Sequence, residues 1–221
     1  MQIQTVLELL GIEVGDIFLE YCRNLHILLN GGHGKNTPGK RWEFDGRTFY
    51  EWESNRETVN RVAKKLHSLG IAVHIITPES DDIPLSERSR RVNELCAKYG
   101  KGNCLLLSVH SNASINHDAR GVSLWTSRGK TKSDEYAEIF WRCAKQHFVD
   151  AKLLADLSDG DHDFEAGFHM VTKTACPAVL VEAFFYDNRK DFDYLLSEEG
   201  REAIADWYVE SIQKCIELYE A

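Results

Sequence analysis

Three apolar segments of this 221-residue chain each end on a side chain that can bind a metal ion or accept a proton. They are HILLNGGHG with His33, CLLLSVHSN with His110, and AVLVEAFF with Glu182. In an open α/β sheet, ligands bind just beyond the carboxyl ends of the parallel strands. If the three segments are strands of one such sheet, two imidazoles and a carboxylate meet at the same edge. This combination predicts a hydrolytic zinc centre.

The three side chains differ in how strongly their surroundings indicate chemistry. Glycines flank His33, so the backbone can turn sharply there and bring the imidazole to the edge of the sheet. A lone histidine is more often structural than a ligand, and the alternative for His110 is a turn histidine that caps its strand. Glu182 follows AVLV directly, where a carboxylate is partly desolvated and costly to leave unpaired. Such a group can be tuned as a proton acceptor, so we expect Glu182 to be catalytic.

The residues alone leave the third metal ligand open. Glu51, Glu53 and Glu57 all lie near the start of a predicted helix, where a carboxylate also suits the positive end of the helix dipole. Helix capping and metal binding are therefore both possible for them. Asn112, just after the second histidine, could fix a ring or a loop carbonyl by hydrogen bonding. Arg88 lies on a polar helix face, where it could simply be solvated.

Strand-like and helix-like patterns alternate along the chain, which predicts a single α/β domain with a mostly parallel twisted sheet flanked by helices. Residues 1–22 are set apart as an N-terminal extension, helical or hairpin-like, and residues 23–221 form the predicted catalytic domain. The periodicity predicts strands at 26–29, 72–76, 104–109, 121–126 and 178–181, and helices at 51–69, 85–99, 134–148 and 204–216.

Composition restricts the class of protein. A hydrophobic content of 43% with 28% charged residues is ordinary for a soluble globular enzyme, and the net charge of −9 argues against a nucleic-acid partner. No apolar stretch approaches the roughly 20 residues of a membrane span. The N-terminus lacks the basic segment of a signal peptide, so we expect a chain that is cytoplasmic as synthesised. The six cysteines form no CxxC pair and are predicted to be free thiols.

Together these segments resemble the zinc-dependent N-acetylmuramoyl-L-alanine amidases, the family of bacterial cell-wall amidases and phage endolysins. The resemblance runs from about residue 26 to residue 216. NGGHGKNTPG resembles the family's Gly-His-Gly turn, SVHSNAS its Ser-x-His-x-Asn turn, LSERSRRVN its arginine helix, and PAVLVEAFFYDN its last strand with a glutamate. The family also opens a helix with a glutamate followed four residues later by an asparagine. Glu51 and Asn55 match that spacing, which selects Glu51 over its neighbours.

The resemblance implies a phosphorylase/hydrolase-like domain that cleaves the amide between N-acetylmuramic acid and L-alanine in peptidoglycan. It implies one Zn²⁺ per chain, held by His33, Glu51 and His110 with a water at the fourth position. Glu182 would accept the proton of that water and pass it to the leaving amine. The residues implied in substrate binding or in support of the ligands are Asn55, Asn112 and Arg88. We expect a monomer that reaches the cell wall after export or lysis.

Two positions depart from the family pattern. Asn30 and Gly31 replace the acid and proline that usually precede the first Gly-His, which removes a carboxylate that would support a ligand. Phe184 stands where glycine is common after the catalytic glutamate, which predicts a bulkier pocket wall and a narrower or different substrate. The aromatic residues expected to pack on glycan or peptide are Trp42, Phe44, Phe49 and Trp125.

Two other classes of function stay open. A zinc peptidase of carboxypeptidase type would keep the metal but would need a cationic pocket for a terminal carboxylate. A catalytically inactive cell-wall-binding module could lose Glu182 without consequence. The products released from defined fragments distinguish the first of these from an amidase, and turnover itself distinguishes the second.

Overall fold

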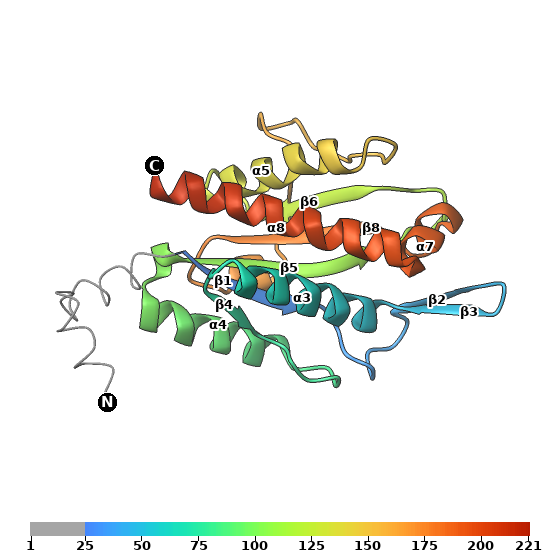
Figure 1. Ribbon diagram of the computed structural model, residues 1–221, viewed down its shortest axis with the longest axis horizontal. Coiled ribbons are helices and arrows are strands. Elements are labelled where there is room, and N and C mark those ends of the chain that lie inside the picture. The colour runs from blue at the N-terminus through green and yellow to red at the C-terminus, as the bar shows by residue number, and fades with distance from the viewer. Residues whose placement is uncertain (1–24) are drawn as a thin grey trace.

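One mixed β-sheet organises the computed structural model, which describes residues 25–221. Its strands are β1 (His26–Gly31), β4 (Val73–Ile75), β5 (Cys104–Asn112), β6 (Val122–Thr126), β7 (Phe164–Glu165) and β8 (Ala178–Phe185). They lie in the order β4-β1-β5-β8-β6-β7 (Figure 1). The neighbours β4, β1, β5 and β8 are parallel, and β6 runs antiparallel to β8. The predicted fold class, an α/β domain with a mostly parallel sheet, is thereby confirmed.

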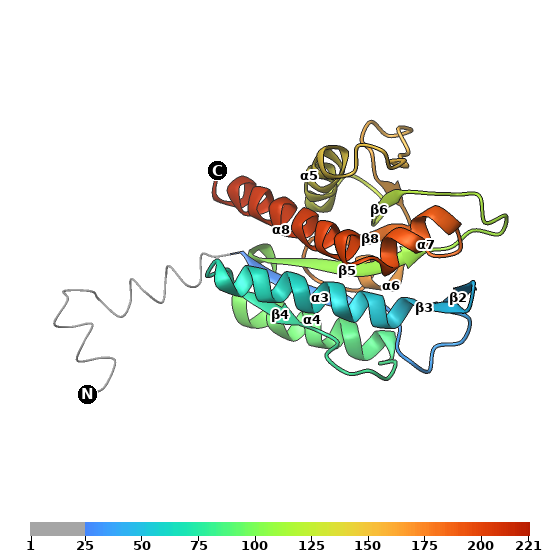
Figure 2. The ribbon, with the colours of Figure 1, turned by 45° about the vertical axis from the view of Figure 1, so that its right-hand side comes forward.

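Helices cover both faces of this sheet. One face packs against α3 (Glu51–Ser68), α5 (Lys132–His147) and α8 (Glu198–Glu220), and the other against α4 (Leu85–Tyr99) and α6 (His169–Thr172). The helices α3 and α8 run side by side across the sheet in both ribbon views (Figures 1 and 2). Two shorter elements are α7 (Arg189–Leu196), which packs against α8, and the 3-10 helix η1 (Lys101–Asn103), which precedes β5.

Side chains of the central strands alternate between two apolar cores. Ile27 and Leu29 face the core that includes α3, α5 and α8, whereas Leu28 faces the core that includes α4 and α6. All three are fully buried. Because both faces of these parallel strands are covered, their sequences are continuous apolar runs rather than alternating ones. The polar residues at their carboxyl ends therefore stand out in the sequence.

A small antiparallel hairpin leads into α3 and was not predicted from the sequence. It consists of β2 (Arg41–Phe44) and β3 (Arg47–Tyr50), and it projects beyond the sheet (Figure 1). Asp45 and Gly46 form its turn with φ angles of 50° and 72°. Positive φ at both central residues is what a tight two-residue hairpin requires, and Asp-Gly supplies it.

Every helix and strand predicted from the sequence within residues 25–221 has a counterpart in the structure. The helix predicted at 85–99 has the observed bounds of α4, and each other predicted helix and strand overlaps an observed one. The predicted N-terminal extension and Cys22 lie outside the described residues, and the other five cysteines are buried free thiols as predicted. Within residues 25–221, no helix is both long and apolar enough to cross a membrane.

Candidate metal centre

Three side chains from distant parts of the chain converge at the carboxyl edge of the sheet. His33 follows β1, His110 lies near the end of β5, and Glu51 is the first residue of α3. Glu51 Oε1 lies 3.3 Å from His33 Nε2 and 3.2 Å from His110 Nδ1. One ligand atom from each residue lies within 4.8 Å of the others. The structure therefore brings together the three residues that the sequence proposes as metal ligands.

The arrangement has the properties of a cation site. Atoms that share a tetrahedral zinc at about 2.0–2.2 Å are roughly 3.4 Å apart, close to the distances from Glu51 Oε1 to the two imidazoles. The Oε2 atom of Glu51 is buried and accepts no hydrogen bond from the part of the chain that the structure describes. Burial alone would raise the pKa of Glu51, but hydrogen bonds with His110 and His33 hold that pKa well below its usual range. Burial lowers the pKa of His110, so an ionised carboxylate and a neutral imidazole, the forms that bind metal, are favoured.

The glycine-rich turn after β1 is shaped by close contacts. A Cβ atom on Gly32 would lie 2.1 Å from His110 Cε1, so the imidazole of His110 occupies the space of a missing side chain. A Cβ atom on Gly34 would lie 2.0 Å from the backbone nitrogen of Asp82. His33 itself has a φ of 59°, in the left-handed region that non-glycine residues rarely adopt. Strain of this kind persists only where the surroundings hold the backbone in place.

Two buried arginines fix this turn by donating hydrogen bonds to its backbone carbonyls. Arg88 Nη1 donates to the carbonyl of Gly31 at 2.7 Å, and Arg88 Nη2 donates to that of His33 at 3.0 Å. Arg56, which the sequence analysis did not single out, donates from Nη2 to the same His33 carbonyl at 2.8 Å. Asp82, Asn30 and the carbonyl of Ile83 accept the remaining bonds of Arg88. Because Arg88 is 2% exposed and fully engaged, its contacts favour a positioning role over substrate contact.

Replacing Arg88 with lysine is expected to weaken zinc binding by roughly 10- to 100-fold and to destabilise the fold by about 2 kcal/mol or more. A single ammonium cannot reproduce the planar fork of donors, so buried carbonyls of the turn lose their partners. Metal titration and thermal unfolding measure the two effects. Arg90→Lys is the control, because Arg90 lies on the same helix but pairs only with Glu87 and Glu94 at the surface. Wild-type zinc affinity in Arg88→Lys would refute the positioning role of Arg88.

Three asparagines near the turn make hydrogen bonds with neighbouring backbone or side-chain groups. Asn55 Nδ2 donates to the carbonyl of Gly32 at 3.3 Å, which places it beneath the turn. Asn30, which replaces the family's usual acid, donates to Ser108 Oγ at 2.8 Å and accepts from Arg88 Nη1 at 3.1 Å. Asn112 Oδ1 accepts from the N–H of Ala113 at 2.8 Å, a contact within its own loop. Asn30 and Asn55 thus support the turn that carries His33, and a substrate role for Asn112 stays a prediction.

Glu182 lies directly beside His110, because these residues pair across the parallel strands β5 and β8. Neighbouring strands are about 4.8 Å apart, so the carboxylate stands next to the three convergent side chains. Its Oε2 atom is buried and has no hydrogen-bond partner among residues 25–221. Burial, and then the negative charge of Glu51, raise the pKa of Glu182 to about 8. A carboxylate in this condition is a strong base for its type.

The prediction that Phe184 forms a bulkier wall of the catalytic pocket is wrong. Between His110 and Asn112 of β5, the partner strand β8 advances one extra residue, from Glu182 to Phe185. Phe184 has a φ of 65° at this bulge, which explains why glycine suits the position. The bulge breaks the alternation that would put Phe184 on the face of Glu182.

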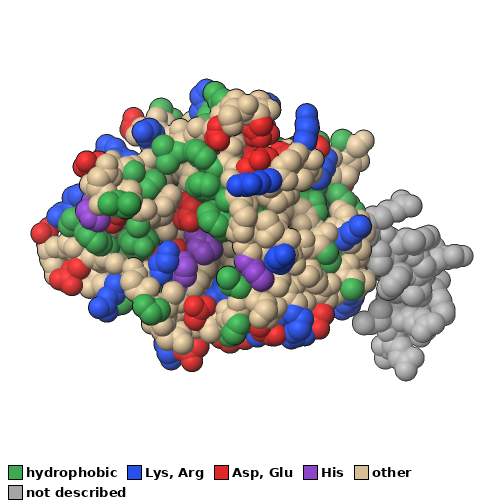
Figure 3. All heavy atoms as spheres, turned by 180° about the vertical axis from the view of Figure 1, so that it is seen from behind, with side chains coloured by type: hydrophobic (Ala, Val, Ile, Leu, Met, Phe, Trp, Pro, Cys, Tyr) green, Lys and Arg blue, Asp and Glu red, His purple; other side chains and the backbone are tan. Residues whose placement is uncertain are grey.

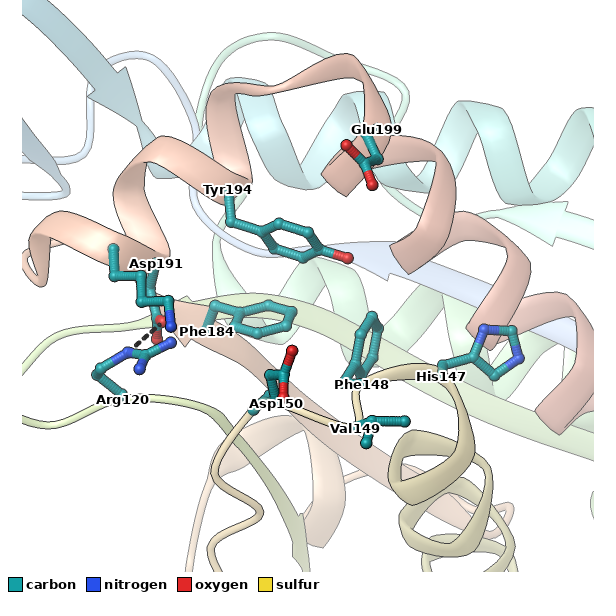
Figure 4. Close-up of a pocket in the computed structure, with 11 residues that line it drawn as sticks. Arg120, His147, Phe148, Val149, Asp150, Phe184, Asp191, Tyr194 and Glu199 are labelled. Atoms are coloured by element: carbon teal, nitrogen blue, oxygen red, sulfur yellow. Dashed lines mark hydrogen bonds and ion pairs between the residues drawn. The ribbon is translucent and has the colours of Figure 1, made fainter.

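Phe184 packs instead in the core beneath α5 and α8. Its ring centroid lies 5.1 Å from that of Phe148 and 5.0 Å from that of Tyr194. These rings border a separate cavity of about 510 Å³, together with Arg120, whose guanidinium pairs with Asp191 (Figure 4). Among the described residues, none lines both this cavity and the cavity beside His33 and His110.

A cavity of about 360 Å³ adjoins the convergent side chains. His33 and His110 line it from the sheet, and Leu85 and Met170 line it from α4 and α6. The side chains of His33 and His110 are 20% and 15% exposed, whereas that of Glu51 is 1% exposed. In Figure 3, histidine side chains reach the surface near the middle of one face, with a lysine or arginine side chain beside them. The centre is therefore open to a substrate from one side.

The aromatic side chains expected to contact substrate are placed unequally. Phe49 is 1% exposed and stacks on Tyr186 inside the protein, so it offers no contact surface and that expectation is wrong. Trp42 and Phe44 are partly buried against the larger core. Trp125 is also partly buried and stacks on Phe164. A role in substrate binding for these three residues stays a prediction.

Known proteins resemble this chain in sequence and in fold. LytC of Bacillus subtilis (strain 168), an N-acetylmuramoyl-L-alanine amidase, is 27% identical over 168 residues, which are 75% of this chain and 30% of LytC. The crystal structure of an N-acetylmuramoyl-L-alanine amidase from Clostridium difficile 630 superposes with a TM-score of 0.73 at 22% identity, covering 88% of this chain and 98% of that one. The catalytic domain of the CD27L endolysin gives 0.64 at 23% identity, covering 86% and 98%.

These likenesses differ in what they establish. The structural neighbours share less than a quarter of their residues with this chain, so they support the fold alone. The chain spans less than a third of the length of LytC. A family model described as N-acetylmuramoyl-L-alanine amidase matches residues 27–214, a range that contains the three convergent side chains and Glu182. With most of its length matched in this way, the chain belongs to the N-acetylmuramoyl-L-alanine amidase family.

Proposed function

We propose that this chain hydrolyses the amide bond between the lactyl group of N-acetylmuramic acid and the L-alanine of a peptidoglycan stem peptide. His33, Glu51 and His110 would hold one Zn²⁺, and Glu182 would act as general base. Residues 23–221 would form the catalytic domain of a monomer that meets its polymer after export or lysis.

One observation carries this proposal: an unpaired carboxylate lies beside three side chains whose geometry suits a catalytic metal. Three protein ligands leave a fourth position open, as catalytic zinc requires, whereas structural zinc is closed by four. The three ligand atoms are nitrogen and oxygen, which zinc accepts readily. A purely structural site would have no use for Glu182, whose Oε2 is buried without a hydrogen-bond partner among the described residues.

The residues of the chain divide the chemistry between them. When bound, Zn²⁺ would lower the pKa of a coordinated water and polarise the scissile carbonyl. Glu182 accepts a proton from the attacking water and later delivers it to the nitrogen of the leaving alanine. The cavity beside His33 and His110 admits the substrate from the open side of the sheet. Arg56 and Arg88 keep the turn that carries His33 in place.

Elemental analysis and digestion of purified cell walls test this function together. We expect close to one equivalent of zinc per chain and release of stem peptides with a free alanine amino terminus, both lost on chelation and restored by zinc. Release of single amino acids from the far end of the peptide would instead identify a carboxypeptidase. Binding to cell walls without any release, at full zinc content, would identify an inactive binding module. Wild-type release from fully zinc-free protein would refute the proposed metal chemistry.

A further inference from the structure

A lysine stands at the mouth of the proposed metal centre. Lys40 Nζ lies 3.6 Å from Glu51 Oε2, and its side chain is 40% exposed whereas that of Glu51 is 1% exposed. The position is fixed by the hairpin: Arg41 pairs with Tyr50, and one step further the N–H of Glu51 donates to the carbonyl of Lys40 at 3.0 Å. Lys40 thus lies opposite the first residue of α3, with its ammonium between the proposed ligand and solvent.

The positive charge of Lys40 acts on two other titratable groups of the centre. It lowers the pKa of both Glu182 and His110, although burial is the larger influence on each. The nearby cations Arg56 and Arg88 are buried and both donate to backbone carbonyls of the turn, and Arg88 also pairs with Asp82. Lys40 differs from them, because its head is accessible and its partner is a carboxylate that the proposed metal would also engage.

This arrangement leaves a solvent-accessible positive charge next to Glu51. A carboxylate that binds a divalent cation has its charge neutralised, so it attracts a neighbouring ammonium only weakly. The favourable partner for Lys40 is then an anion that arrives with the substrate. An ammonium close to such a partly buried centre distinguishes a carboxylate from a neutral amide of the same shape, because bonds to charged groups are the stronger ones.

We propose that Lys40 binds the free α-carboxylate of the second residue of the leaving peptide, the residue after the alanine, and thereby sets substrate preference. This inference rests on the proposed amidase function. In a stem peptide the second residue is linked through its side-chain carboxyl, so its α-carboxyl is free. That group is a charged carboxylate in isoglutamate and a neutral carboxamide in isoglutamine. Lys40 makes the enzyme selective for the acid form.

Two soluble substrates test the inference with the zinc-loaded, full-length protein: N-acetylmuramoyl-L-alanyl-γ-D-glutamyl-L-lysine and its isoglutamine counterpart, in both of which the side-chain carboxyl of the second residue is linked to the lysine. We expect the wild type to prefer the acid by roughly 10- to 100-fold in kcat/KM, the range of one charge-assisted bond. Lys40→Met should lose this preference by slowing on the acid alone. Lys40→Glu should prefer the amide. Zinc content and melting temperature are measured for each variant, so that a loss of metal or fold is recognised.

The control is Arg41→Met, a removal of positive charge at the next residue of the hairpin. Arg41 is exposed, and successive strand residues point to opposite sides, so its variant should keep the wild-type preference. An equal loss on both substrates in Lys40→Met would overturn the inference, since Lys40 would then act on the scissile carbonyl or the metal. A wild type without preference would overturn it as well. Failure of the zinc-loaded wild type on both substrates would instead refute the amidase function itself.

Discussion

Replacing Glu182 with glutamine is expected to lower kcat by roughly 10²- to 10⁴-fold, the usual contribution of a positioned general base. Glutamine keeps the shape of the side chain but cannot take a proton from water. The zinc content should stay near one equivalent, because Glu182 lies beside the three convergent side chains rather than among them. Steady-state hydrolysis of a muramoyl peptide, with metal analysis of the same sample, measures both quantities. Hydrolysis at the wild-type rate would remove Glu182 from the mechanism.

The pH dependence of the same variant gives an independent check. Glu182 works as a base only when ionised, so wild-type activity should fall as the pH drops through its pKa, and Glu182→Gln should lack that limb. In metal-free protein the raised pKa means that ionising Glu182 costs stability, and this cost grows as the pH rises from the ordinary glutamate range toward 8. Glu182→Gln should therefore raise the melting temperature of metal-free protein more at pH 9 than at pH 5. Glu53→Gln, at an exposed position of α3, should change neither.

Replacing Gly32 with alanine is expected to weaken zinc binding by at least about 100-fold although every proposed ligand remains. The added Cβ would lie 2.1 Å from His110 Cε1 and 2.6 Å from His110 Nε2, closer than side chains tolerate. His110 sits on the buried strand β5, so its ring must rotate out of the ligand position instead of moving with its backbone. Activity should fall with the metal. Zinc titration against a competing chelator measures the affinity.

Gly102→Ala is the matched control for this change. Gly102 has no atom within 4 Å of the added Cβ and no unusual backbone angle, so alanine there should leave zinc affinity unchanged. Full zinc affinity in Gly32→Ala would show that the metal does not need the observed position of His110. Loss of folding in Gly32→Ala, seen as loss of its cooperative thermal transition, would show that the contact serves the fold instead of the site.

The sequence was most informative where burial makes it regular. Strands covered on both faces are apolar runs, so β1, β5 and β8 and the polar residues at their ends are visible without coordinates. The hairpin signal, Asp45-Gly46 between alternating residues, is present in the sequence, although no strand was predicted there. Arg56 carried no such signal, since its role depends on contacts with a turn more than twenty residues away.

Phe184 shows a different limit of prediction. Strand alternation puts it on the face of Glu182, and only the inserted residue at the bulge reverses that assignment. A one-residue shift in register changes the face of every following side chain, and apolar residues on both sides of β8 leave no pattern to detect it. Sequence patterns therefore identify the residues at this edge of the sheet, and the backbone decides which of them share a space.

The hairpin leaves the body of the protein at Lys40 and returns to it at Glu51, where a single backbone hydrogen bond closes its base. Its tip is tied to α7 by ion pairs from Asp45 to Arg189 and from Arg47 to Asp193. The start of α3 is thus held at the base of the hairpin by the bond from Glu51 to Lys40. Natural variation or protein engineering can therefore change the residues of this hairpin, and with them the surface beside the proposed site, while His33, Glu51, His110 and Glu182 are kept.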